Sequence, residues 1–423
     1  MVLASRDAFS LGHLRYHSAR IGFRRDGYGN SQKHSFPEAR LIMRCWMIGA
    51  VVVAMLAVCG DAFAAPELET LLETIKAVGR EGQGNAAAGQ AVSELSQRGA
   101  ESLPLVLAAF ADANPLAANF LRSAVEAIAD RAKKSGKSLP KSELEKFITN
   151  KEQDPRGRRL AYELLSNVDA SAPDRLIPGM LLDPSPEFRR DAVARLIESG
   201  EKALKDKEND AAKAAFKKAL SGATDDDQVK TVAKQLKELK EEVDLKKHFG
   251  FLTEWRVIGP FDNVAFKGFD AVYPPEEKLD LTATLKGQKD DVKWEKFATD
   301  HEYGIFNIAK QVAPHKGATM YAVTEFHSPA ARVVELRLGT PNAWKLWLNG
   351  KLLFGRDEYH RGMAIDQYRV RGELKPGANT ILLKICQNEQ TEDWAQRYEF
   401  QLRVADLSGI GIASQAAQAT SQK

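Results

Sequence analysis

The feature that most constrains this 423-residue chain is a change of residue pattern near position 249. A charged helical run ends with residues 241–247, EEVDLKK. Soon afterwards Trp255, Val257 and Ile258 bring aromatic and β-branched residues, which suit a half-buried strand. Gly259-Pro260 then predicts the end of this first strand. The pattern predicts a multidomain α-then-β protein, in which helices are followed by strands.

The stretch from Phe249 to Asn263 joins these two regions and has two interpretations. In the first, its strand is packed beneath the sheets. In the second, residues 261–263 form a binding loop. The sequence favours the first interpretation but leaves both open.

The first 64 residues have the features of an export signal. Residues 1–42 are rich in Arg and lack periodicity, which favours Met43 as the true start and an upstream extension included by mistake. Residues 43–64 combine Arg44, an apolar run from Met47 to Val58 and an A-x-A site ending at Ala64, as in a signal peptide. We expect an exported protein of the periplasm, the cell envelope or the medium, with no stable membrane span after cleavage. An uncleaved anchor and a lipoprotein remain alternatives.

Charge and cysteine content limit the partners of the remaining chain. Residues 1–64 contain eight of the 60 Lys and Arg and four of the 57 Asp and Glu, which leaves a net charge of −1. Nucleic-acid binding needs a basic patch, so we expect no nucleic-acid partner. Cys386 alone remains after cleavage and lies in an apolar strand, which predicts a buried, unreactive thiol.

Residues 66–200 contain a helical repeat. Its alignment places small residues at Ala91, Ala124, Ala161 and Ala192, where neighbouring helices can approach closely. Polar N-caps followed by Pro predict helix starts at Asn114-Pro115, Asp154-Pro155 and Ser185-Pro186. The region resembles HEAT repeats, most clearly in residues 183–193, DPSPEFRRDAV. That resemblance implies a stacked α-solenoid, in which each unit buries its apolar face against its neighbours, and it does not identify a partner.

Residues 201–247 resemble one tetratricopeptide helix pair. Residues 210–220 have A-x3-F-x2-A spacing, and a second helix is expected from about Asp226 to Val243. One pair is too short for a repeat array, so we expect it to cap the solenoid. A peptide-binding groove is the alternative.

Residues 249–407 predict an antiparallel β-sandwich. Asn349-Gly350 between two apolar runs is a type I′ hairpin signal. Several short strands separated by turns are typical of sandwiches, and we expect them at residues 319–326, 332–338, 367–371, 380–385 and 397–404. The Ala-, Ser- and Gln-rich tail, 408–423, is expected to be disordered.

This block resembles the galactose-binding-like jelly roll, such as the sugar-binding domain of family 2 glycoside hydrolases. The resemblance rests on residues 343–351 (AWKLWLNGK), 368–370 (YRV) and 374–381 (LKPGANTI), and it covers about residues 318–405. It implies a non-catalytic module that could bind carbohydrate.

A polar and aromatic loop between two predicted strands is the main candidate site. Sugars are held by aromatic faces and planar hydrogen-bonding side chains. The loop offers such residues at Arg356, Asp357, Tyr359, His360 and Arg361. An exposed loop with local ion pairs is the alternative interpretation.

Two tryptophans extend the candidate site. Period-two alternation places Trp344, Leu346 and Leu348 on the core face and Trp347 on the opposite face. Trp347 is then expected either to stack on a ligand or to pack under the helical domain. Trp394 belongs to a group at residues 388–394 that could line the same end of the sandwich. The acidic residues of that group leave calcium as a weak alternative.

The sequence lacks the motifs of common enzymes. It has no G-x-S-x-G, H-E-x-x-H, phosphate loop or dinucleotide fingerprint, so we expect no catalytic residue, cofactor or metal. The expected function is a non-catalytic exported binding or scaffold protein: the helices contact a protein, and the sandwich binds carbohydrate or another envelope polymer. The alternatives are a purely protein–protein scaffold and an unrecognised exported hydrolase.

Overall fold

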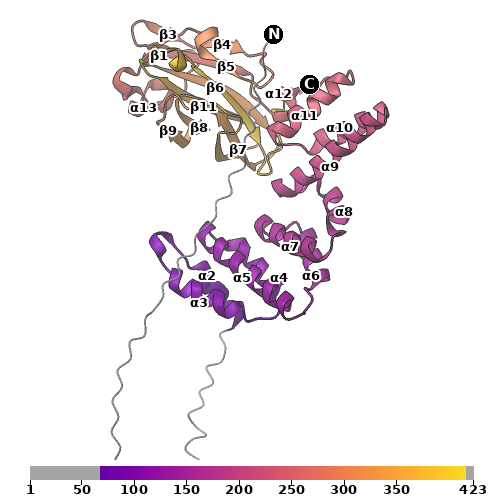
Figure 1. The fold of residues 1–423 in the computed structure, drawn as a ribbon. Coiled ribbons are helices and arrows are strands. Elements are labelled where there is room, and N and C mark those ends of the chain that lie inside the picture. The colour runs from indigo at the N-terminus through magenta and orange to yellow at the C-terminus, as the bar shows by residue number, and fades with distance from the viewer. Residues whose placement is uncertain (1–66, 416–423) are drawn as a thin grey trace, which may run out of the picture. The chain divides into compact units, whose positions relative to one another are not determined.

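A computed structural model describes residues 67–415, in which a helical region precedes antiparallel sheets (Figure 1). The α-then-β prediction is therefore confirmed. The predicted extension, the signal peptide and residues 416–423 of the tail lie outside the described residues. Within residues 67–415, no helix is both long enough and apolar enough to cross a membrane.

The helical region consists of α-helices that range from 5 to 20 residues in length. Its α-helices are α2 (Leu68–Lys76), α3 (Asn85–Leu95), α4 (Leu103–Ala108), α5 (Pro115–Lys134), α6 (Lys141–Thr149), α7 (Pro155–Val168), α8 (Ala172–Leu176), α9 (Pro186–Lys205), α10 (Asn209–Gly222), α11 (Asp226–Glu238) and α12 (Leu245–Phe249). Short 3₁₀ turns lie at Arg80–Gly82, Ala100–Ser102, Ala109–Asp112 and Ile177–Met180.

The three predicted helix starts are confirmed. Helices α5, α7 and α9 each begin at the proline after the predicted cap. The Asn114 side chain accepts hydrogen bonds from the amides of Leu116 and Ala117, which satisfies two of the donors that a helix start leaves unpaired. Asp154 caps α7 in the same way, whereas the Ser185 side chain makes no capping bond.

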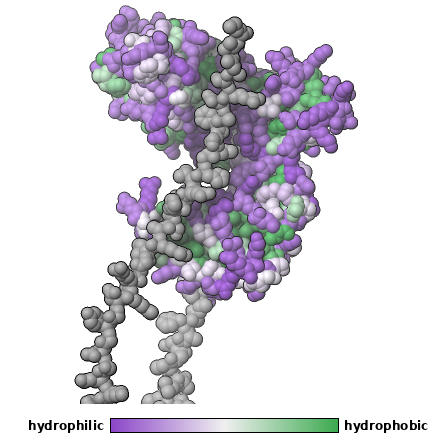
Figure 2. Space-filling model, viewed as in Figure 1, coloured by the Kyte–Doolittle hydropathy of each residue, from purple (hydrophilic) through white to green (hydrophobic). Residues whose placement is uncertain are grey.

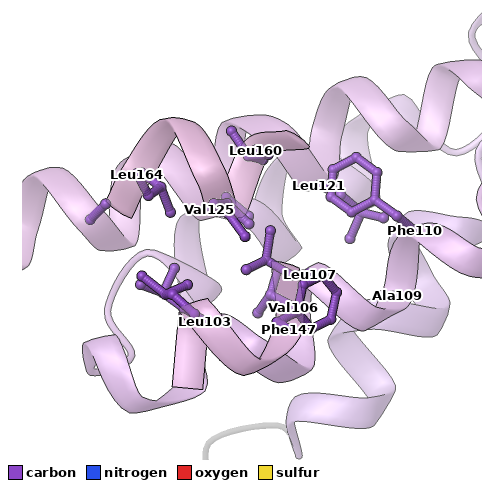
Figure 3. Packing of buried hydrophobic residues seen from close by; sticks show 14 of the residues in the cluster. Leu103, Val106, Leu107, Ala109, Phe110, Leu121, Val125, Phe147, Leu160 and Leu164 are labelled. Atoms are coloured by element: carbon purple, nitrogen blue, oxygen red, sulfur yellow. The ribbon is translucent and has the colours of Figure 1, made fainter. Parts of the chain in front are cut away.

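Small residues allow the helices to pack closely. The four aligned alanines, Ala91, Ala124, Ala161 and Ala192, are all buried. Around them, apolar side chains from α4, α5, α6 and α7 meet in one core, which includes Leu107, Leu121, Phe147 and Leu160 (Figure 3).

This packing gives a stability prediction on α3. Ala91 is 2 % exposed, so the Ala91→Leu substitution should overpack the core and lower the free energy of unfolding by about 1–3 kcal/mol. Ala87 lies on the same helix and is exposed, so Ala87→Leu should change it by less than about 0.5 kcal/mol. Urea denaturation followed by circular dichroism measures both. Equal effects of the two substitutions would contradict the close packing at Ala91.

Helices α10 and α11 form the predicted pair, but the second helix is shorter than expected. It ends at Glu238 rather than near Val243, because the chain turns at Lys240 with a left-handed φ of 62°. Phe216 of α10 is buried in a cluster that also contains Phe249, Phe251 and Tyr303. The pair therefore packs both on α9 and toward the sheets.

Three sheets follow, and all their pairings are antiparallel. A six-stranded sheet has the order β4-β1-β6-β11-β8-β9, a four-stranded sheet has the order β10-β7-β12-β5, and β2 pairs with β3. The strands are β1 (Glu254–Asp262), β2 (Thr284–Lys286), β3 (Asp291–Lys293), β4 (Glu295–Ala298), β5 (Phe306–Asn307), β6 (Ala318–Ser328), β7 (Arg332–Gly339), β8 (Ala343–Leu348), β9 (Lys351–Arg356), β10 (Tyr368–Leu374), β11 (Gly377–Gln387) and β12 (Glu399–Ala405).

The hairpin turn at residues 349–350 was predicted correctly, but the predicted end of the first strand was wrong. Asn349 and Gly350 have φ values of 52° and 80°, as a type I′ turn requires, and Leu348 pairs with Lys351 across them. Gly259-Pro260 does not end β1, however. The strand continues to Asp262 through an irregularity in its pairing with β6, and proline is tolerated at such a bulge.

The two large sheets face each other across one core. Trp344, Leu346 and Leu348 point into it, as alternation predicted, and residues of β7 and β12 meet them from the other sheet. The outer face of the six-stranded sheet is also partly covered. Residues 273–294, between β1 and β4, pack there on Tyr321 and Trp347.

Buried charge joins the helical region to the sheets. Arg403 of β12 donates to the Phe249 carbonyl at 3.0 Å and to the Gly409 carbonyl at 3.2 Å. Its other guanidinium nitrogens bind Asp366, which also pairs with Arg337 at 2.6 Å. The junction therefore depends on hydrogen-bonded ion pairs.

The expected disorder of the tail does not begin at residue 408. The Ile412 amide donates to the Val404 carbonyl at 2.8 Å, and the Gln415 amide donates to the His327 carbonyl. The Ser408 carbonyl accepts from Arg189 of α9. Backbone hydrogen bonds to the sheet thus order residues 408–415, a pairing that their composition did not indicate.

Candidate functional site: an aromatic ledge at one end of the sandwich

Sheet order brings three loops to one edge. Because neighbouring strands of the six-stranded sheet are antiparallel, β1, β11 and β9 run in the same direction. Their carboxyl ends therefore share an edge. The loops that leave it begin at Asn263, at Asp357 and at Asn388.

Aromatic side chains gather on these loops. We call Phe266, Tyr359, His360 and Trp394 the aromatic ledge. Phe266 is 51 % exposed and Trp394 is 60 % exposed, whereas Tyr359 is half-buried between the loops. Hydrophilic residues predominate on the face of the molecule in Figure 2. Within residues 67–415, Phe266, Phe354 and Trp394 are the aromatic residues among the exposed large hydrophobic side chains, and such residues can mark binding surfaces.

Ring contacts hold the ledge together. The Phe266 and Tyr359 ring centroids are 5.2 Å apart, and those of His360 and Trp394 are 5.0 Å apart with the rings at 85°. Tyr359 and His360 lie 6.3 Å apart. These are edge-to-face or tilted arrangements within the favourable range for aromatic pairs.

Two asparagines behind the ledge position it. The Asn263 amide donates to the Tyr359 hydroxyl at 3.2 Å and to the Gln387 carbonyl at 2.9 Å. A ring nitrogen of His360 lies 2.8 Å from the Asn388 amide oxygen. Both asparagines are buried, so they fix the two rings from beneath.

The backbone of the ledge is conformationally unusual. Ala265, Phe266 and His360 have φ values of 57°, 63° and 56°. Residues with side chains rarely adopt this left-handed region, and such outliers cluster at functional sites. The contacts beneath the loops offset the cost of these conformations.

The charged candidates divide into two groups. Arg356 and Arg361 both pair with Glu358, at 3.9 Å and 3.1 Å, which is the local ion-pair arrangement that the sequence left open. Burial, with a contribution from the Asp270 charge, raises the pKa of Asp357. Burial also raises the pKa of the Tyr359 phenol. That phenol is therefore a neutral hydrogen-bonding group at neutral pH.

Trp347 does not belong to the ledge, and both predictions for it are wrong. It is 5 % exposed, so it offers no open face to a ligand. It packs with Tyr321 and with Trp294 and other residues of the 273–294 segment that covers this face, not with the helical region. The sequence predicted its side of the strand correctly but did not reveal the cover.

Phe266 of the ledge and Asn263 behind it have roles that the sequence did not show. A binding loop at residues 261–263 was one interpretation, but Phe261 and Asn263 are buried, and the exposed aromatic lies at Phe266. Residues 388–394 do reach the same end, as considered. Within residues 67–415, no group of three or more His, Cys, Asp or Glu side chains is placed to hold a metal ion.

Comparisons with known proteins give no family. No family model and no curated protein matches the chain. One similar solved structure is a GH31 α-xylosidase from Xanthomonas citri, at 14 % identity and a TM-score of 0.17, covering 27 % of this chain and 15 % of the xylosidase. Another is an alkylpurine DNA glycosylase from Pseudomonas fluorescens, at 13 % identity and a TM-score of 0.20, covering 83 % of this chain and 97 % of that one. Likenesses this weak carry no argument about function.

Proposed function

We propose that this chain is an exported, non-catalytic binding protein whose galactose-binding-like sandwich binds carbohydrate at the aromatic ledge. The exposed Trp394 ring beside His360 is the observation that carries the proposal. A flat ring in contact with water offers a surface for the apolar face of a sugar. The HEAT-like helices present a separate surface to a protein partner.

Polar groups near the rings support this assignment. The Tyr359 hydroxyl and the His360 imidazole are held by Asn263 and Asn388, so their orientations are set before a ligand arrives. Preorganisation lowers the entropic cost of binding. Sugar hydroxyls can both donate and accept hydrogen bonds, which matches such polar groups.

The test is a polysaccharide pull-down and calorimetric titration with the chain from residue 65 onward. We expect the Trp394→Ala substitution to weaken binding by about 2 kcal/mol, or roughly thirtyfold, as for a central aromatic contact. Phe354→Ala is the matched control, because Phe354 is also an exposed aromatic but lies on the edge strand β9. It should leave binding unchanged.

Two results would contradict the proposal. One is an absence of binding to a broad panel of polysaccharides by a chain that circular dichroism shows to be folded. The other is binding that Trp394→Ala and Phe354→Ala weaken equally. Either result would favour the protein–protein scaffold, in which the sandwich contacts only protein.

A further inference from the structure

A cleft lies between helix α11 and the sheets, and its residues are distinct from those of the ledge. Its volume is about 380 Å³, within the usual range for small-molecule sites. Asp226 and Lys230 of α11 line one side, and Tyr303, Arg397 and Gln401 line the other together with the 363–365 segment. The helical region and the sandwich both contribute, so neither alone would make the site.

Three polar groups in this cleft lack hydrogen-bond partners among residues 67–415. Gln401 is only 4 % exposed, and its buried side-chain oxygen accepts no hydrogen bond. The Oδ1 atom of Asp226 is also buried and unpaired, although its Oδ2 accepts from Lys230 at 2.7 Å. The Tyr303 hydroxyl has no partner in the same residues. Buried polar groups are nearly always paired, so the two buried unpaired oxygens, of Gln401 and Asp226, in the lining of one cleft indicate an occupant.

The charges of the cleft indicate that this occupant is neutral. Asp226 is balanced by Lys230 at 2.7 Å, and the Arg397 Nε is 2.6 Å from a carboxylate oxygen of Glu399. A charged ligand would bring an unbalanced charge into a partly desolvated site, which is costly. The groups left over are an amide, a hydroxyl and one carboxylate oxygen, which together require both donors and acceptors from the ligand.

Apolar surface completes the site. The Tyr303 ring is fixed by Phe249 and Phe251, with centroids at 6.0 and 6.4 Å, and by the Lys230 ammonium at 5.1 Å. Met363 and Ile365 line the same cleft. An occupant therefore needs an apolar face as well as hydroxyl groups around its edge.

We propose that this cleft binds a neutral, hydroxyl-rich ring of the size of one monosaccharide unit. The inference does not depend on the ledge, because different residues carry it. The loop from residue 388 to 398 supplies Trp394 to the ledge and Arg397 to the cleft. A ligand bound in the cleft would therefore contact both α11 and this loop.

The experiment titrates the chain from residue 65 onward with glucose, galactose, mannose and N-acetylglucosamine, by calorimetry and by saturation-transfer NMR. We expect at least one of these sugars to bind. Gln401→Met and Tyr303→Phe keep the shape of each side chain but remove its hydrogen bonds, so each should weaken that binding at least about tenfold. Phe354→Ala on the edge strand β9, outside both the cleft and the ledge, is the control and should leave it unchanged.

Charged analogues test the second part of the inference. Glucuronic acid and glucosamine should bind at least about tenfold more weakly than their neutral counterparts, because the cleft is already charge-balanced. The proposal is overturned if none of the four neutral sugars binds, if Gln401→Met and Tyr303→Phe leave binding intact, or if a charged sugar binds best. If Trp394→Ala abolishes binding and the two cleft variants do not, the sugar binds at the ledge and the proposal for the cleft is wrong.

Discussion

Replacing Asp366 with Asn should destabilise the protein by about 3–5 kcal/mol, because it leaves buried cations without their anion. Arg403 is almost completely buried, and its guanidinium binds both carboxylate oxygens of Asp366 at 2.6 Å. Arg337 pairs with the same carboxylate and would retain only Glu335. Removing one partner of a buried ion pair costs far more than the pair contributes over an apolar substitute.

Asn removes the charge of Asp366 without changing the backbone requirement at this position. Asp366 has a φ of 57°, and Asn tolerates left-handed backbone as well as Asp does, so the conformational cost is unchanged. Denaturation in urea, followed by circular dichroism, measures the effect. Asp225→Asn is the matched control, because Asp225 forms a solvent-exposed pair with Arg190, and its loss should cost less than about 1 kcal/mol.

Acid should remove the difference between wild type and Asp366→Asn. Burial alone would raise the pKa of Asp366, but the hydrogen bond and charge of Arg403, aided by Arg337, hold it below its ordinary value. Its stabilising contribution is therefore complete above pH about 4 and is lost as pH falls through the lowered pKa. A difference that stays constant down to strong acid would contradict this ion pair as the source.

Glu276→Gln should have a similar cost, about 3–5 kcal/mol, for a different part of the fold. The Lys384 ammonium is 0 % exposed and lies 2.7 Å from the Glu276 carboxylate, which also accepts from the Tyr321 hydroxyl. The carbonyls of Phe269 and Ala271 accept the other two protons. Burial lowers the pKa of Lys384, so the loss of its only carboxylate partner leaves a poorly solvated charge.

The part of the fold that Glu276→Gln should destabilise first can also be predicted. Glu276 belongs to the 273–294 cover over the outer face, so its loss should loosen that cover before it unfolds the sandwich. Tryptophan fluorescence reports this directly, because Trp347 is buried beneath the cover and Trp294 is a buried residue of the cover itself, so their emission should shift to the red on exposure. Glu277→Gln, at the exposed neighbouring residue, should change neither the spectrum nor stability.

A double substitution separates loss of charge balance from loss of shape. Lys384→Met combined with Glu276→Gln removes the unpaired ammonium, and methionine is flexible enough to fill the space of the lysine stem. The double variant should therefore be more stable than Glu276→Gln alone. Equal instability of the two variants would show that packing of the cover, rather than the buried charge, dominates.

Much of the fold could be predicted because it is encoded locally. The Asn-Pro, Asp-Pro and Ser-Pro pairs place helix starts, since a cap and the first helical φ involve adjacent residues. Asn349-Gly350 places a hairpin, because both residues tolerate positive φ. Alternation along β8 placed Trp344, Leu346 and Leu348 in the core, since successive strand residues face opposite sides.

The candidate site could be predicted only in part. The loop chemistry indicated Tyr359, His360 and Trp394, and the structure brings these three together. It could not indicate Phe266, because that contact depends on the order of strands in the sheet. Nor could it indicate that Trp347 is covered, since residues 273–294 show no strand pattern that would mark them as a layer.

By itself, then, the sequence determined the order of helices and strands, the helix starts, the hairpin and the inward face of β8. Interactions between residues a few positions apart decide such features. Tertiary structure alone decided the pairing of Arg403 with Asp366 across 37 positions, the seating of Lys384 under its cover, and the meeting of three loops at the ledge. These contacts depend on which strands lie side by side, and that order is set by burial over the whole chain rather than by any local pattern.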